Sequence, residues 1–151
     1  MRTPASIYKY PIHPMLIVFP IGLWVFSLAC DLFRLAGASG EPWITVAYYS
    51  MVGGFIGVLC AAVPGLIDLL YYKGGVAPFK KIALTHMTIN LVVVALYGLN
   101  IWLRTTDPGV KGASLSTPVL LSIIGVALLC VSGWLGGQVV HVYGVGVEGR
   151  E

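Results

Sequence analysis

Four long stretches of this sequence contain no Asp, Glu, Lys or Arg, and each is long enough to cross a lipid bilayer. A hydrocarbon core about 30 Å thick needs roughly 20 helical residues. Only 10% of the residues are charged, whereas about 25% is typical of soluble domains. The sequence therefore predicts one integral membrane domain, residues 1–151, with spans at about 14–34, 43–71, 82–104 and 117–140. The charge-free stretches are Tyr10–Cys30, Pro42–Ile67, Ile82–Leu103 and Gly112–Val147.

The linkers between these stretches are short and contain Gly and Pro, at Gly37–Pro42, Lys73–Lys81 and Thr105–Ser114. Connections of this length make consecutive helices antiparallel neighbours. We therefore expect an all-α four-helix transmembrane bundle with up-down-up-down topology, and both termini on the same side of the membrane.

The distribution of basic residues predicts which side that is. Six lie on the side of the termini and three on the other, and an excess of Lys and Arg marks the cytoplasmic side. The net charge of +3 is spread over both sides, which does not indicate nucleic-acid binding. The six are Arg2, Lys9, Lys73, Lys80, Lys81 and Arg150, and the three are Arg34, Arg104 and Lys111.

The three cysteines are far apart in apolar stretches, which predicts packing residues and no disulfide framework or thiolate metal site. Cys30 has a second interpretation. Arg2 and Lys9, an apolar stretch and then Ser-Leu-Ala-Cys loosely resemble a lipoprotein signal cleaved before Cys30. The intact mass of the protein distinguishes the two interpretations. The other cysteines are Cys60 and Cys130.

A polar stripe runs along the third span, in the segment Thr85–Arg104. Its residues follow one another at helical spacing, so they lie on one side of the helix. Polar side chains are costly in lipid, and we therefore expect the stripe to face other helices. Near the opposite side of the membrane, we expect Arg104 to anchor the helix at the interface and Asp31 to pair with Arg34. The stripe consists of His86, Asn90, Tyr97, Asn100 and Arg104.

Four side chains that can bind a metal or transfer a proton lie near the predicted cytoplasmic side. His13 begins the first span, Asp68 ends the second, His86 begins the third and His141 ends the fourth. A carboxylate at the depth of Asp68 either reaches water at the helix end or belongs to a site. The separation of His13 from Asp68 equals that of His86 from His141, which suggests two hairpins related by an axis along the membrane normal.

Histidine is the commonest protein ligand of transition metals and a frequent axial ligand of haem. We therefore predict that His13 and His86 bind haem b or a transition metal, with Asn90 and Asp68 as supporting partners and His141 as a further metal ligand. Taken singly, each histidine is also explained as an interfacial residue that bonds to backbone or headgroups. Two seams of small residues could admit a flat ring: Gly53, Gly57, Ala61 and Gly65, and Gly133 with Gly137.

Several motifs together resemble one family of bacterial membrane proteins, domain of unknown function 2231. They are IHPMLIVFPIGLW, GLIDLL, THMTINLVVVALYGLNIWLR and GWLGGQVVHVYGVGV, which cover nearly the whole chain. The resemblance implies a multi-pass protein of the bacterial inner membrane, associated with Rieske-type or cytochrome redox modules. The family pattern has His beside the final Gly-Val-Gly-Val, where this chain has Tyr143, and this departure favours His13 and His86 over His141 as the pair.

Two further functions remain open at this point. The chain could be a non-catalytic scaffold or assembly subunit of a membrane redox complex, with a polar stripe that serves only helix packing. It could also be a small proton-coupled transporter that relays protons through Asp68 and His86, and with four spans it would have to oligomerise. The sequence has no nucleophile elbow, phosphate-binding loop or suitably spaced carboxylate pair, which disfavours hydrolysis and phosphoryl transfer. If haem is bound, electron transfer to quinone is the expected activity.

Overall fold

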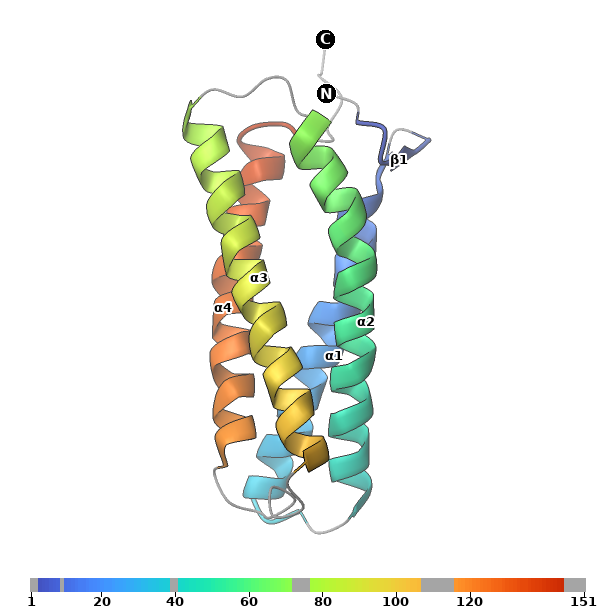
Figure 1. Ribbon diagram of the computed structural model, residues 1–151, viewed down its shortest axis with the longest axis vertical. Coiled ribbons are helices and arrows are strands. Elements are labelled where there is room, and N and C mark those ends of the chain that lie inside the picture. The colour runs from blue at the N-terminus through green and yellow to red at the C-terminus, as the bar shows by residue number, and fades with distance from the viewer. Residues whose placement is uncertain (1–2, 9, 39–40, 72–76, 107–115, 146–151) are drawn as a thin grey trace.

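The computed structural model is a bundle of four long helices, as Figure 1 shows, and it describes residues 3–8, 10–38, 41–71, 77–106 and 116–145. Its helices are α1 (Ile12–Leu35), α2 (Glu41–Tyr71), α3 (Ala77–Thr106) and α4 (Thr117–His141). Two short antiparallel strands, β1 (Ser6–Ile7) and β2 (Tyr10–Pro11), precede α1. The prediction of an all-α four-helix bundle is confirmed.

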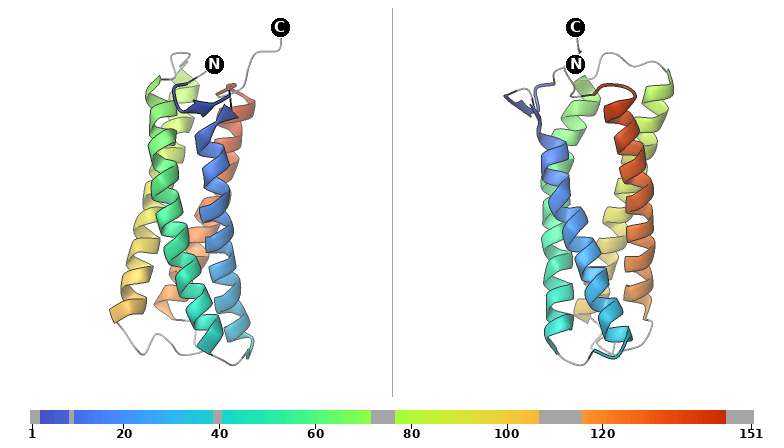
Figure 2. Two further views of the ribbon diagram at one scale, coloured as in Figure 1. Left: turned by 90° about the vertical axis from the view of Figure 1, so that its right-hand side faces the viewer. Right: turned by 180° about the vertical axis from the view of Figure 1, so that it is seen from behind.

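Each helix is long and apolar enough to cross a membrane. The start of α1 and the end of α4 lie at the same end of the bundle (Figures 1 and 2). We call this the histidine end, because His13 lies in the first turn of α1 and His86 in the third turn of α3, both near it. The cytoplasmic orientation of this end stays a prediction.

The helices pack most closely in two pairs, α1 with α2 and α3 with α4. Figure 1 shows these pairs side by side, and we call them hairpin one (α1 and α2) and hairpin two (α3 and α4). Glycines of α2 allow close packing within hairpin one: a Cβ at Gly57 would lie 3.2 Å from the ring of Pro20, and one at Gly53 3.3 Å from Leu23. Small residues that let helices approach are the usual means of association in lipid.

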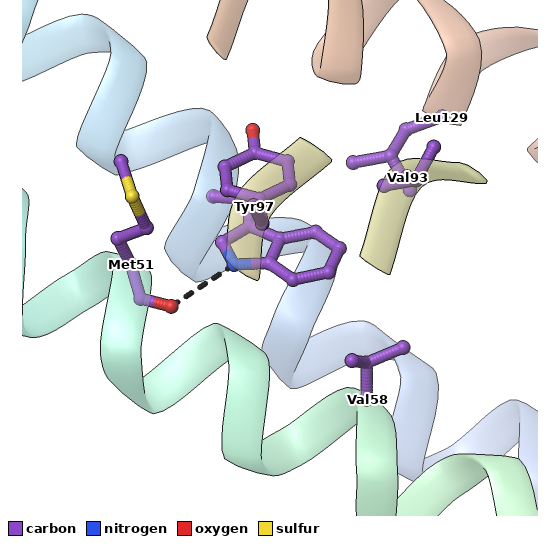
Figure 3. Close-up of a cluster of buried hydrophobic side chains, with 6 residues drawn as sticks. Met51, Val58, Val93, Tyr97 and Leu129 are labelled. Carbon is purple, nitrogen blue, oxygen red and sulfur yellow. Dashed lines mark hydrogen bonds between the residues drawn. The ribbon is translucent and has the colours of Figure 1, made fainter. Parts of the chain in front are cut away.

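A layer of large buried side chains joins the two hairpins (Figure 3). Trp24 of α1 stacks on Tyr97 of α3, with ring centroids 3.9 Å apart and planes 3° from parallel. The Trp24 indole N–H donates to the Met51 carbonyl of α2 at 3.0 Å. Val58, Val93 and Leu129 complete this core. The stack fixes hairpin one against hairpin two near the middle of the bundle.

A buried ion pair joins the hairpins at the opposite end of the bundle. Both carboxylate oxygens of Asp31 accept hydrogen bonds from Arg104, and their side chains are 0% and 8% exposed. Arg104 also donates to the Asn100 amide oxygen at 3.0 Å. Arg104 therefore faces the interior of the bundle and pairs with Asp31, where we expected an interfacial anchor and a local Asp31–Arg34 pair. A bidentate pair inside the bundle is stronger than a local pair at the helix edge.

Residues before α1 fold back over the histidine end of hairpin one, an arrangement that we did not predict. Thr3 and Ala5 are each only 5% exposed. The Ala5 carbonyl accepts a hydrogen bond from the Ile12 N–H at 3.0 Å, and the Thr3 hydroxyl donates to Asp68. The start of the chain thereby covers the end of α2.

Candidate functional site

His13 is held against α2 by its ring nitrogen Nδ1. This nitrogen lies 2.7 Å from the Ala61 carbonyl oxygen. A carbonyl only accepts hydrogen bonds, so Nδ1 is the ring nitrogen that carries a proton in this contact. The ring rests on Gly65, where a Cβ would lie 2.7 Å from Nδ1. Hairpin one thus fixes both the position and the tautomer of this imidazole.

His86 is held against α4 in the same way. Its Nδ1 lies 2.9 Å from the Ser132 carbonyl oxygen and 3.0 Å from the Ser132 hydroxyl. That hydroxyl donates to the Asn90 amide oxygen at 2.8 Å, and the Asn90 amide NH2 donates to His86 Nε2 at 3.0 Å. The ring lies over Gly136, where a Cβ would be 3.1 Å from Cε1. This closed network again places the proton on Nδ1.

Each hairpin therefore contributes one half-buried imidazole with the same protonated nitrogen. His13 and His86 lie close enough across the bundle for a charge on one ring to affect the other. Nδ1–H bonded to a backbone carbonyl is the usual arrangement of a metal-binding histidine, because it orients Nε2 for the ligand. The two rings differ in their further contacts: His86 Nε2 already accepts a hydrogen bond from the Asn90 amide, and its Nδ1 also lies near the Ser132 hydroxyl.

Asp68 lies near His13, one member of this pair. Asp68 is buried, with 9% of its surface exposed. Its carboxylate accepts a hydrogen bond from the Thr3 hydroxyl and lies close enough to His13 for their charges to interact. This burial argues against a carboxylate that simply reaches water at the helix end. A role of Asp68 in a site stays a prediction.

The remaining predicted ligand, His141, is exposed as the last residue of α4. Among the residues that the structure describes, no three His, Cys, Asp or Glu side chains are arranged to hold a metal ion. Ligation by His141 stays a prediction.

The polar stripe of α3 faces the interior, as predicted. Tyr97 is 1% exposed and Asn100 is 0% exposed. Asn100 donates to the Pro118 carbonyl at 2.8 Å and to the Ser122 hydroxyl at 2.9 Å, both on α4. Sequence reasoning missed Ser132, the partner of both His86 and Asn90. The sequence could have identified Ser132, because a serine within an apolar span is expected to face a polar neighbour.

The family model of the predicted membrane proteins DUF2231 matches residues 9–149. The chain belongs to the DUF2231 family. The match includes all four helices and the histidine pair, and it agrees with their length and apolar character. This DUF2231 protein is therefore a multi-pass membrane protein, and the family resemblance of its motifs is confirmed. No curated protein matches the chain, and no solved structure does.

Gly65 should be required for the position of the His13 ring. In Gly65→Ala, the new Cβ would meet Nδ1 at 2.7 Å, so the ring must move off the Ala61 carbonyl. We expect the free energy of unfolding to fall by about 1–3 kcal/mol, as for other overpacked sites. Unfolding by sodium dodecyl sulfate, followed by circular dichroism, measures this change.

Gly137→Ala is the matched control, because a Cβ there would meet nothing within 4 Å. This variant should be as stable as the wild type, or more stable by about 0.5–1 kcal/mol because alanine favours helix. Equal stability of Gly65→Ala and Gly137→Ala would contradict the close packing of His13 on α2.

Proposed function

We propose that this DUF2231 protein binds haem b between its two hairpins, with His13 and His86 as axial ligands, and passes electrons within the membrane. The observation that supports this most directly is the matched setting of the two imidazoles. Each has Nδ1 bonded to a backbone carbonyl of the neighbouring helix, and each comes from a different hairpin. Haem iron takes one axial ligand on each face of a flat ring, and two facing helix pairs can supply both.

A haem fits these residues better than a bare transition metal. Metal ions bound by protein alone are generally held by three or four side chains. The described residues contain no such group of His, Cys, Asp or Glu, whereas haem needs only two protein ligands. When bound, haem would supply one-electron transfer.

The neighbouring residues have defined roles in this proposal. The Ala61 and Ser132 carbonyls orient the rings and make Nε2 a better ligand. The Asn90 amide, which now bonds to His86 Nε2, must turn away from it before that nitrogen can serve as a ligand. Asp68, beside His13, offsets positive charge. Quinone and Rieske-type or cytochrome proteins of the bacterial inner membrane are the partners that fit this activity.

The visible spectrum of the purified protein tests this function. After expression with added haem precursor and purification in detergent, the wild type should show a Soret band and stoichiometric haem. His13→Ala and His86→Ala should each lose most of the haem, because one axial ligand is removed. His141→Ala is the matched control and should keep it. A wild type without a Soret band, or full haem retention in both His13→Ala and His86→Ala, would refute the proposal.

One observation favours a second function, that of a non-catalytic subunit of a membrane complex. Both ring nitrogens of His86 already have protein partners, Ser132 and Asn90, so the network serves packing without any ligand. In that case a protein partner should co-purify with the chain. The variant His13→Ala/His86→Ala should then keep that partner, and no haem should be found in the wild type.

A further inference from the structure

We infer that the chain consists of two equivalent hairpins related by a pseudo-two-fold axis along the bundle, and that the Asp31–Arg104 pair on this axis specifies the association of unlike hairpins. The inference does not depend on haem binding. It names an interaction surface, the inner face of each hairpin, and the partner that this face fits: a hairpin with the opposite charge at the equivalent position.

Contacts between α1 and α3 provide the first evidence. The two helices correspond at the 73-residue offset that separates Asp31 from Arg104. At this offset Trp24 corresponds to Tyr97, on which it stacks. Residues contact their own counterparts only near a two-fold axis, and here a ring pair and an ion pair both do so. His13 and His86, which interact electrostatically, correspond at the same offset.

Contacts within each hairpin provide independent evidence. His13 and Ala61 are 48 residues apart, and His86 and Ser132 are 46 apart. A second pair of hydrogen bonds shows the same difference: the sequence separation is again two residues smaller in hairpin two than in hairpin one. Ser27 bonds to the Ala47 carbonyl over 20 residues at 2.7 Å, and Asn100 bonds to the Pro118 carbonyl over 18 residues at 2.8 Å. The rings also rest on equivalent glycines: Trp24 on Gly54, Tyr97 on Gly125, His13 on Gly65 and His86 on Gly136.

This correspondence corrects the repeat that the sequence suggested. The offset between His13 and His86 was right for α1 and α3. In α2 and α4 the offset is two residues smaller, so the counterpart of Asp68 is Val139 and not His141. Only hairpin one therefore has a carboxylate beside its histidine.

The charges at the axis decide which hairpins can pair. If two copies of hairpin one associated, Asp31 would face Asp31, and two copies of hairpin two would place Arg104 against Arg104. Both side chains are almost completely buried, where like charges repel strongly. The aromatic rings and glycines, in contrast, are similar in both halves and discriminate little. The ion pair therefore acts as the specificity element, by attraction in one combination and repulsion in the other two.

Charge exchange in the full-length chain tests the inference. Asp31→Arg and Arg104→Asp each place like charges at the axis, and we expect the yield of monodisperse single-chain bundle, measured by light scattering in detergent, to fall about tenfold or more. The exchange variant Asp31→Arg/Arg104→Asp restores opposite charges and should recover most of the yield. Lys80→Asp makes the same charge change as Arg104→Asp at an exposed position of α3 and should behave like the wild type.

A second exchange variant allows for the neighbours of the pair. Arg104 is supported by Asn100, whose counterpart in hairpin one is Ser27. Adding Ser27→Asn and Asn100→Ser to the exchange moves this support with the arginine, and should raise the recovery further. If both exchange variants are as poorly recovered as the single ones, or if the single variants match the wild type, the inference is wrong.

Discussion

Replacing Arg104 by methionine should lower the free energy of unfolding by about 3–5 kcal/mol, the usual cost of removing one partner of a buried ion pair. The Asp31 carboxylate, which is fully buried, would be left without its counter-charge. Methionine has a similar length and keeps the apolar contacts of the arginine stem. Unfolding by sodium dodecyl sulfate, followed by circular dichroism, measures the loss.

The double variant Asp31→Leu/Arg104→Met separates the unpaired charge from the loss of packing. Well-packed apolar residues often replace a buried ion pair without loss of stability, so we expect this variant to regain most of the loss. Lys80→Met, at an exposed position of the same helix, should change stability by less than about 0.5 kcal/mol. A double variant as unstable as Arg104→Met would show that the unpaired carboxylate is not the cause.

The inward face of α3 was predictable because two constraints agree on it. Helical spacing puts His86, Asn90, Tyr97, Asn100 and Arg104 on one side, and lipid penalises polar groups that face outward. Both constraints act within a single helix and need no knowledge of its neighbours. The same reasoning predicted the helices themselves from their apolar length.

The partners of this face were not predictable in the same way. Asp31 has a basic residue three positions away, Arg34, yet it pairs with Arg104, which is 73 residues distant. That choice depends on the rotation of α1 and α3 about their axes, which follows from the packing of Trp24 against Tyr97. The spacing of residues within one helix contains no information on this rotation. The only indication in the sequence was that Asp31 and Arg104 have opposite charges and lie near the same side of the membrane.

The candidate site was predictable in its side chains and not in its backbone partners. His13 and His86 stand out as polar residues in apolar helices. Their acceptors are the carbonyls of Ala61 and Ser132, and every residue has a carbonyl, so no residue type marks them. The glycines beneath the rings are visible in the sequence as small residues, but their purpose becomes clear only when the ring positions are known.

The internal repeat was only half visible for a similar reason. Some equivalent positions contain different residues, such as Asp31 and Arg104, because each contacts its own counterpart across the axis. Complementary contacts of this kind select unlike residues, which weakens the sequence signal where the structural signal is strongest. The two-residue difference between the hairpins then moved α2 and α4 out of register, and paired Asp68 with His141 instead of Val139.

Trp24→Ala should have the other large effect, a loss of about 3 kcal/mol in the free energy of unfolding. This is the low end for a buried tryptophan replaced by alanine, because the unfolded side chain is solvated by detergent or lipid and not by water. The variant removes the ring that stacks on Tyr97 and the hydrogen bond to the Met51 carbonyl. The same detergent titration measures the change, and near-ultraviolet circular dichroism should report a weakened aromatic signal.

Two variants identify the stack as the cause of this loss. Trp134→Ala removes the same residue type from a position that is 67% exposed, and should cost less than about 0.5 kcal/mol. Trp24→Phe keeps an aromatic ring against Tyr97 and mainly loses the hydrogen bond to Met51, worth about 1 kcal/mol. It should therefore be clearly more stable than Trp24→Ala. If Trp24→Phe were as unstable as Trp24→Ala, the hydrogen bond to α2 would matter more than the stack, and hairpin one alone would account for the effect.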